Sequence, residues 1–217
     1  MRFKAFEKAI SKLNTLNLPG VEVQLKMAPP FREQLIERYK EERKTAKPAA
    51  VLALFYPSKT GETLLVLILR KSYKGVHSAQ IGFPGGKPEP EDVSMEATAL
   101  RETWEEIGVS SEKITVMCEL TPTYIPPSNF LVSPFLGIAQ EHLTFTLQAS
   151  EVEAVLEVSL TDFLNDDYEV ISEIIAAEGV TYKVPAFMLN DHVVWGATAM
   201  MLIEIKSMLN LILKKIA

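Results

Sequence analysis

The chain has only one cysteine, Cys118, so no disulfide bond can form within it. Its first ten residues, MRFKAFEKAI, contain no uninterrupted apolar segment of the length that a signal peptide needs. The apolar stretch near the carboxyl end is interrupted by Glu204, Lys206 and Asn210, which argues against a membrane span. These absences predict a cytoplasmic protein with no membrane partner.

The charge balance is acidic but unevenly distributed. The 217 residues carry a formal net charge of −6, whereas residues 1–48 alone contain eleven Lys and Arg against six Asp and Glu. An acidic body argues against nucleic acid as a partner. The charges of the first segment alternate in sign along the expected helices, so we interpret that segment as a solvated face.

Hydrophobic periodicity predicts the elements. Helical spacing occurs among Phe3, Phe6, Ile10 and Leu13, and again after Pro29. Apolar runs predict strands at 49–56, 63–70, 114–120, 130–138, 152–158, 168–174 and 181–187. Further helices are expected at 94–107, with Gly108 as the C-cap, and at 196–215. The predicted buried side of the last helix consists of Met201, Leu202, Ile205, Met208, Leu209 and Ile212. This order predicts an α+β fold, an α/β/α sandwich with a mixed sheet between helices. We expect an N-terminal helical extension over 1–47 and the main domain over 48–217.

The helix expected at 94–107 concentrates negative charge. On a helical wheel, its predicted buried face gathers within roughly 80° and consists of Ala97, Leu100, Trp104 and Ile107. The opposite face carries Glu102, Glu105 and Glu106. Like charges at this spacing repel, and the helix dipole is already negative in the last turns. Only Arg101 offsets this repulsion locally.

Two interpretations of these carboxylates stay open at this point. One is a solvated acidic helix face. The other is a site for a hard divalent cation such as Mg²⁺ or Mn²⁺, which prefers oxygen ligands. The Gly85–Gly86 turn lies just before the helix and lets a backbone carbonyl approach such an ion. A site of this kind suits pyrophosphate chemistry, with a free carboxylate to accept the proton of the attacking water.

The segment GGKPEPEDVSMEATALRETWEEIGV resembles the Nudix box, G-x5-E-x7-R-E-U-x-E-E-x-G-U, where U is a bulky apolar residue. The matching positions are Arg101, Glu102, Glu105, Glu106, Gly108 and Val109. The spacing from Gly86 to Arg101 is one residue longer than in the general pattern. Asp92 stands at the position of the early Glu, and Thr103 replaces a bulky apolar residue. The longer spacing is similar to that of the coenzyme A pyrophosphatase branch.

An upstream segment, LILRKSYKGVHSAQIGFPGGK, resembles the signature of the same branch. The matching positions are Arg70, Ser72, His77, Gln80, Phe83, Pro84, Gly85 and Gly86, whereas Ala79 replaces the usual glycine. The resemblance covers roughly residues 48–205. It implies a Nudix fold and the metal-dependent hydrolysis of a pyrophosphate linkage.

The resemblance also implies roles for individual residues. The expected metal ligands are Glu102, Glu106, Glu105, the carbonyl of Gly86 and, from a later loop, Glu151, with Glu153 as the alternative. The expected catalytic residues are Glu105, as ligand or general base, Glu102 and Arg101, which holds a glutamate in place. The expected substrate-binding residues are Arg70, His77, Gln80, Lys87, Asn129 and Phe130, with Tyr124 shaping the pocket. Trp104 and Trp195 are expected in the core.

The substrate implied is a small nucleotide, coenzyme A or a derivative, cleaved to 3′,5′-ADP and a 4′-phosphopantetheine species with Mg²⁺ or Mn²⁺. One alternative keeps the chemistry but changes the substrate to ADP-ribose, a dinucleotide polyphosphate or a nucleoside triphosphate. A second is a Nudix module that binds a ligand or protein without catalysis, which the intact set of Arg101, Glu102, Glu105 and Glu106 argues against. The apolar N-terminal helices are expected to pack either on the chain's own body or on a second subunit of a homodimer.

Overall fold

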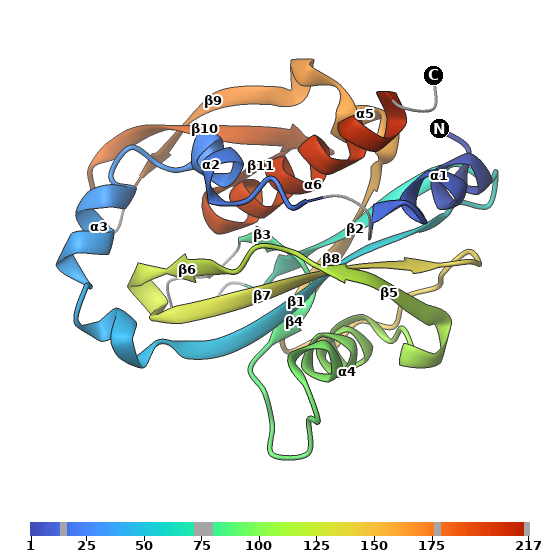
Figure 1. Cartoon of the computed structure of the whole chain (residues 1–217), viewed down its shortest axis with the longest axis horizontal. Coiled ribbons are helices and arrows are strands. Elements are labelled where there is room, and N and C mark those ends of the chain that lie inside the picture. Colours follow the sequence, from blue (N-terminus) through green and yellow to red (C-terminus); the bar gives the residue numbers. More distant parts are fainter. Residues whose placement is uncertain (14–16, 72–79, 176–178, 215–217) are drawn as a thin grey trace.

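The computed structural model describes residues 1–13, 17–71, 80–175 and 179–214 (Figure 1). The helices are α1 (Phe3–Ile10), α2 (Val21–Gln24), α3 (Arg32–Arg38), α4 (Met95–Ile107), α5 (Leu160–Leu164) and α6 (Gly196–Lys214). The strands are β1 (Lys47–Pro57), β2 (Thr63–Arg70), β3 (Ile81–Gly82), β4 (Gly85–Gly86), β5 (Ile114–Glu119), β6 (Thr123–Ile125), β7 (Phe130–Ala139), β8 (Val152–Ser159), β9 (Glu169–Ile175), β10 (Thr181–Leu189) and β11 (His192–Trp195). Short 3-10 helices are η2 (Leu25–Met27), η3 (Glu42–Thr45), η4 (Ser111–Lys113), η5 (Pro126–Ser128) and η6 (Asp166–Tyr168).

The main sheet is mixed, as predicted. Its central path runs β3-β2-β1-β7-β5, while β4 pairs with β1, β6 with β7 and β8 with β2. β1 and β7 run parallel, from Lys47 opposite Phe130 to Phe55 opposite Ile138, and the other described pairs in this sheet are antiparallel. The pairing of β4 with β1 brings the Gly85–Gly86 turn beside the centre of the sheet.

Alternating side chains of the two central strands divide the core into two layers. Leu52, Leu54 and Val66 face α4, whereas Phe55 and Leu65 face α1 and α6. Figure 1 shows α4 on one side of the sheet and α6 on the other. The predicted mixed sheet between helices is therefore confirmed.

Three features extend this plan. Strands β9, β10 and β11 form a separate antiparallel sheet beside α6, which the sequence had predicted only as a pair of strands. The N-terminal α1 packs on the chain's own core, where the rings of Phe6 and Phe55 lie 5.0 Å apart. The domain boundary predicted at residue 47 stays a prediction. Helix α1 of the N-terminal extension packs against β1 of the main domain through this contact.

Helix α6 is long and apolar enough to cross a membrane by length and composition, and it is the one such helix in the described part of the chain. Most of its apolar window is buried inside the protein, against α1, α2, β10 and β11. The predicted buried side, Met201, Leu202, Ile205, Met208, Leu209 and Ile212, is confirmed. Two charged residues, Glu204 and Lys206, are buried with it.

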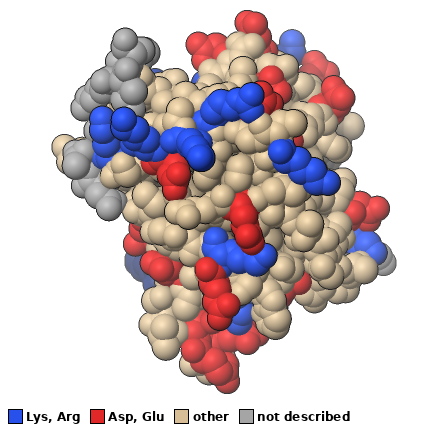
Figure 2. Space-filling model, turned by 90° about the vertical axis from the view of Figure 1, so that its right-hand side faces the viewer, with Lys and Arg blue, Asp and Glu red and all other residues tan. Residues whose placement is uncertain are grey.

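Charged side chains are unevenly distributed on the surface. Figure 2 shows acidic side chains at the lower end of the molecule, the end at which Figure 1 places the loop before α4. Glu89 and Glu91 are exposed in that loop. One acidic region of the surface therefore lies at the end that carries the carboxylate-rich helix.

Candidate active site

Helix α4 begins and ends as its sequence dictates. The hydroxyl of Ser94 accepts a hydrogen bond from the backbone N–H of Ala97 at 3.1 Å, which caps the first turn. Gly108 adopts the left-handed conformation, and its N–H donates to the carbonyl of Trp104 at 2.8 Å. The C-cap prediction is confirmed, and these two caps fix the ends of the helix that carries the glutamates.

The predicted orientation of α4 was wrong for two of its residues, although Ile107 is buried as expected. Glu106, expected on the solvated face, is 1% exposed, whereas Trp104, expected in the core, is 58% exposed. The small side chains of Ala99 and Thr103 let the helix approach the sheet closely, and the Thr103 hydroxyl donates to the Ala99 carbonyl at 2.7 Å. The helix therefore turns Glu106 toward polar partners on the sheet and leaves the indole outside.

Glu106 meets the glycine turn and an arginine. Its Oε2 accepts a hydrogen bond from the Gly85 N–H at 2.8 Å, and its Oε1 lies 2.9 Å from Arg70 Nη1. Arg70 Nη2 also donates to the Gly85 carbonyl at 2.8 Å. The Arg70 contact with Oε1 lacks hydrogen-bond alignment, so this buried oxygen has no hydrogen-bond donor among the described residues.

Burial raises the pKa of Glu106 to about 7, although Arg70 and the Gly85 N–H oppose the shift. The negative charges of Glu102 and Glu151 raise it further. Burial also raises the pKa of Glu102, against the effect of Arg101 and with a contribution from Glu151. The three carboxylates are thus close enough to influence one another.

The glycines of the turn are required by these contacts. A side chain at Gly86 would collide with the Glu102 carboxylate, and one at Gly85 would collide with the carbonyl of Ala50. Gly85 also has φ +150°, which other residues rarely adopt. The backbone of the turn and the carboxylates of α4 are therefore in direct contact.

Arg101 ties the acidic residues together. It binds Asp92 through Nε and Nη2, at 3.0 Å each, and Glu102 and Glu105 at 3.2 Å each. Its Nη2 also donates to the carbonyl of Lys87 at 2.8 Å. The sequence indicated that Arg101 holds a glutamate but missed that Asp92 is its strongest partner. The alignment of Asp92 with the early Glu of the Nudix box was the available signal.

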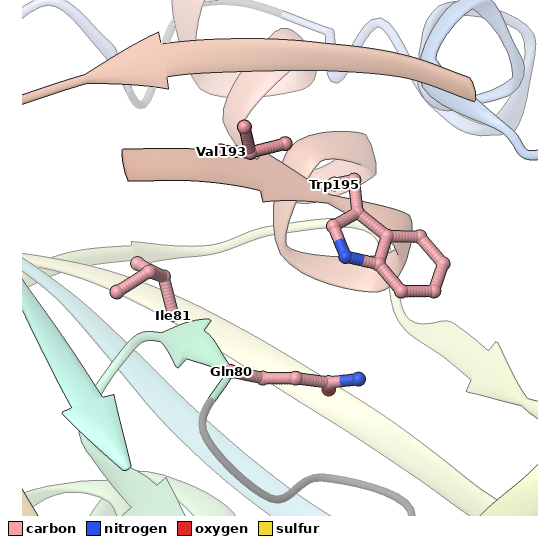
Figure 3. Close-up of a pocket in the computed structure, with 4 residues that line it drawn as sticks. All are labelled: Gln80, Ile81, Val193 and Trp195. Atoms are coloured by element: carbon pink, nitrogen blue, oxygen red, sulfur yellow. The ribbon is translucent and has the colours of Figure 1, made fainter. Parts of the chain in front are cut away.

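The remaining predicted residues fall into three groups. His77 lies outside the described residues. Gln80 lines a cavity of about 60 Å³ with Ile81, Val193 and Trp195, between β3 and β11 (Figure 3). Lys87 places its ammonium 5.5 Å from the centre of the Phe130 ring, and Asn129 accepts a hydrogen bond from the Tyr124 hydroxyl at 3.0 Å. The half-buried Trp195 borders a cavity rather than filling the core.

The donor set suits a hard divalent cation, because it offers carboxylates, a backbone carbonyl and one buried oxygen without a donor. Within residues 1–13, 17–71, 80–175 and 179–214, however, no three Asp, Glu, His or Cys side chains form a group able to hold a metal. Glu102 and Glu105 turn to Arg101, and Glu106 turns to Arg70. The residues fit a cation by chemistry, and in this structure their carboxylates are held by Arg70 and Arg101.

Comparisons with known proteins identify the family of the chain. A sequence model of the NUDIX domain matches residues 46–177. An uncharacterised Nudix hydrolase named NudL, from Photorhabdus laumondii, is 32% identical over 136 residues, which are 62% of this chain and 71% of that protein. The chloroplastic Nudix hydrolase 22 of Arabidopsis thaliana is 32% identical over 166 residues, 73% of this chain and 54% of that protein.

Solved structures with a similar fold include a MutT/nudix family protein from Enterococcus faecalis. It has a TM-score of 0.47 and 16% identity, and the match covers 82% of this chain and 73% of that one. The matched family model covers most of the present sequence and contains the glycine turn and the whole of α4. The chain therefore belongs to the Nudix family and is a Nudix pyrophosphohydrolase.

Proposed function

We propose that this protein hydrolyses the pyrophosphate linkage of coenzyme A or a derivative, releasing 3′,5′-ADP and a 4′-phosphopantetheine species. The observation that carries the chemistry is the contact of Glu102 and Glu106 with the Gly85–Gly86 backbone. The substrate rests on the resemblance of the segment from Arg70 to Lys87 to the coenzyme A signature.

The residues proposed to hold the metal are Glu102, Glu106, Glu151 and the Gly86 carbonyl, with Glu105 either as a further ligand or as the general base. When bound there, Mg²⁺ or Mn²⁺ supplies neutralisation of phosphate oxygens and acidification of a water molecule. Glu102 and Glu106 lie one helical turn apart and meet the same glycine turn. That common contact supports the choice of these two as the central ligands.

The chain's own residues have distinct tasks in this proposal. Water attacks one phosphorus, the bridging P–O bond breaks, and two phosphomonoesters leave. Glu105, whose side chain is 38% exposed, is the most accessible of the three helix carboxylates and accepts the proton of the water. Arg101 positions Glu102 and Glu105 through its two ion pairs. Arg70 holds Glu106 against Gly85.

A cytoplasmic location and a nucleotide partner complete the proposal. The acidic surface around the loop before α4 (Figure 2) supports attraction of a cation rather than of nucleic acid. A homodimer remains a prediction, and the measured molar mass of the purified protein in solution decides it.

The deciding experiment is a product assay. The purified protein is incubated with Mg²⁺ or Mn²⁺ and, separately, with coenzyme A, ADP-ribose, diadenosine polyphosphates and nucleoside triphosphates. Products are identified by mass spectrometry. The controls are the wild type in the presence of a metal chelator and the Glu106→Gln variant. We expect 3′,5′-ADP and 4′-phosphopantetheine from the metal-loaded wild type alone. Cleavage of another compound, with coenzyme A intact, would overturn the substrate and leave the chemistry standing.

A further inference from the structure

Two arginines of the N-terminal extension converge on Tyr124, outside the glutamate site. Arg32, at the start of α3, donates through Nη2 to the Tyr124 carbonyl at 3.0 Å. Arg43, in η3, places its guanidinium carbon 5.4 Å from the centre of the Tyr124 ring. Figure 1 shows α3 beside the β6–β7 hairpin, at the left of the molecule. Two cationic groups from different elements thus share one neighbour.

These two charges lack a counter-charge in the described part of the chain. No carboxylate there forms an ion pair with Arg32 or Arg43, and the acidic side chain that acts on neighbouring Tyr124 is the exposed Glu42. Arg32 Nε is buried and has no hydrogen-bond partner among the described residues. Burial lowers the pKa of Arg32, and the positive charge of Arg43 lowers it further. A buried donor and two repelling cations are costly unless an anion joins them.

A contact chain connects this pair to the glycine turn. The Tyr124 hydroxyl donates to Asn129, and the next residue, Phe130, lies under the ammonium of Lys87, which follows Gly86. The strand register gives the distance along β1 between Phe130 and the glycine turn. Phe130 lies opposite Lys47 and Gly86 opposite Ala50, three residues along β1, so the two levels are about 10 Å apart. A ligand whose pyrophosphate is anchored at the turn therefore needs a second anionic group, separate from the pyrophosphate, to pair with the arginines.

We propose that Arg32 and Arg43 bind a phosphomonoester of the substrate that is separate from the pyrophosphate, which in coenzyme A is the 3′-phosphate. Two guanidinium groups match the charge and the fork geometry of a phosphate. This assignment rests on the proposed function. It gives the N-terminal extension a task in recognition, because the extension supplies both arginines.

The test compares coenzyme A with 3′-dephospho-coenzyme A, which differs in that phosphate alone. KM and kcat are measured for both compounds with the wild type, Arg32→Gln and Arg43→Gln. We expect each variant to raise KM for coenzyme A by about tenfold, the loss of one charged contact, and to leave KM for the dephospho compound within twofold. Arg32→Lys is expected to restore part of the difference because it keeps the charge.

Arg38→Gln is the matched control, since it removes the same charge from α3 at a side chain that contacts the ring of Tyr39 instead. The thermal midpoint of every variant shows that it is folded. An equal loss for both compounds, or no loss for either, would overturn the proposal. If neither compound is cleaved, binding of 3′,5′-ADP and 5′-AMP is measured by calorimetry. Tighter binding of 3′,5′-ADP that Arg32→Gln abolishes supports the phosphate site while the proposed substrate fails, and equal affinities overturn the site.

Discussion

Glu106 and Glu204 are both buried carboxylates on helices, one in α4 and one in α6, yet their surroundings differ. Glu204 accepts hydrogen bonds from the Gly20 N–H, the Gln24 amide and the Thr121 hydroxyl, and all three donors are neutral. Glu106 has one neutral donor, the Gly85 N–H, and a poorly aligned arginine.

The difference separates a structural charge from a functional one. Three donors satisfy Glu204 and bind the N-terminal segment to α6, so its carboxylate has little left to offer a ligand. Glu106 keeps one oxygen without a hydrogen bond, and burial raises its pKa to about 7. A carboxylate that is costly to bury without a cation is suited to bind one.

The largest effect is expected from Glu106→Gln. This change keeps the shape of the side chain and removes the charge beside the glycine turn, so we expect kcat to fall by at least about 10²-fold. The free energy of unfolding is expected to change by less than about 1 kcal/mol, because an imperfectly paired buried charge contributes little net stability. Activity assays and urea denaturation of the same preparations measure both quantities. A variant that loses stability and keeps its activity would place Glu106 in the same class as Glu204.

The opposite result is expected for Glu204→Gln. Replacing the carboxylate weakens three charge-assisted hydrogen bonds, so we expect the free energy of unfolding to fall by about 2 kcal/mol. The activity per folded molecule is expected to stay within twofold, since Glu204 is separated from α4 by the main sheet. Glu22→Gln, an exposed position on α2, provides the control and should not change stability. Equal stability of both variants would show that the three hydrogen bonds contribute nothing.

Local signals in the sequence were sufficient for the elements that carry the site. Ser94 and Gly108 mark the ends of α4, and apolar runs bounded by turn residues identified β1 and β2. The buried side of α6 followed from its helical period. These features depend on neighbouring residues in the sequence, which is why periodicity and capping rules predict them.

The sequence could not predict which charges are buried. A helical wheel ranks positions by polarity and therefore placed Glu106 outside and Trp104 inside. The actual orientation of α4 depends on Gly85 and Arg70, which the β-sheet brings to the helix. Burial of Glu204 likewise depends on Gly20 and Gln24, about 180 residues earlier in the chain. Hydrogen bonds and ion pairs between segments that are distant in the sequence can be identified only in the folded structure.

A smaller effect separates Asp92 from both glutamates. The Arg101 hydrogen bonds lower the pKa of Asp92 to about 2, so its ionised form stabilises the folded state above the unfolded pKa of about 4. This contribution is lost as the pH falls toward 2. We expect Asp92→Asn to be less stable than the wild type by about 1 to 2 kcal/mol at pH 7. The difference in thermal midpoint should shrink between pH 4 and pH 2. A difference that stays constant over that range would assign the effect to shape and not to charge.

The smallest effect concerns Cys118, which reports the charge of Glu204 without taking part in its hydrogen bonds. Burial raises the pKa of this thiol to about 11, and the negative charge of Glu204 raises it further. Because the thiolate is the reactive form, alkylation of the native protein at pH 8 should be about 100-fold slower than that of an unperturbed thiol. In Glu204→Gln the rate is expected to rise by a few-fold, since burial remains and the charge is gone. Mass spectrometry after timed iodoacetamide treatment measures both rates, with the Glu22→Gln protein as the reference. If the alkylation rate is unchanged in a folded Glu204→Gln protein, burial alone accounts for the raised pKa of the Cys118 thiol. The three hydrogen-bond donors would then fully compensate the negative charge of Glu204.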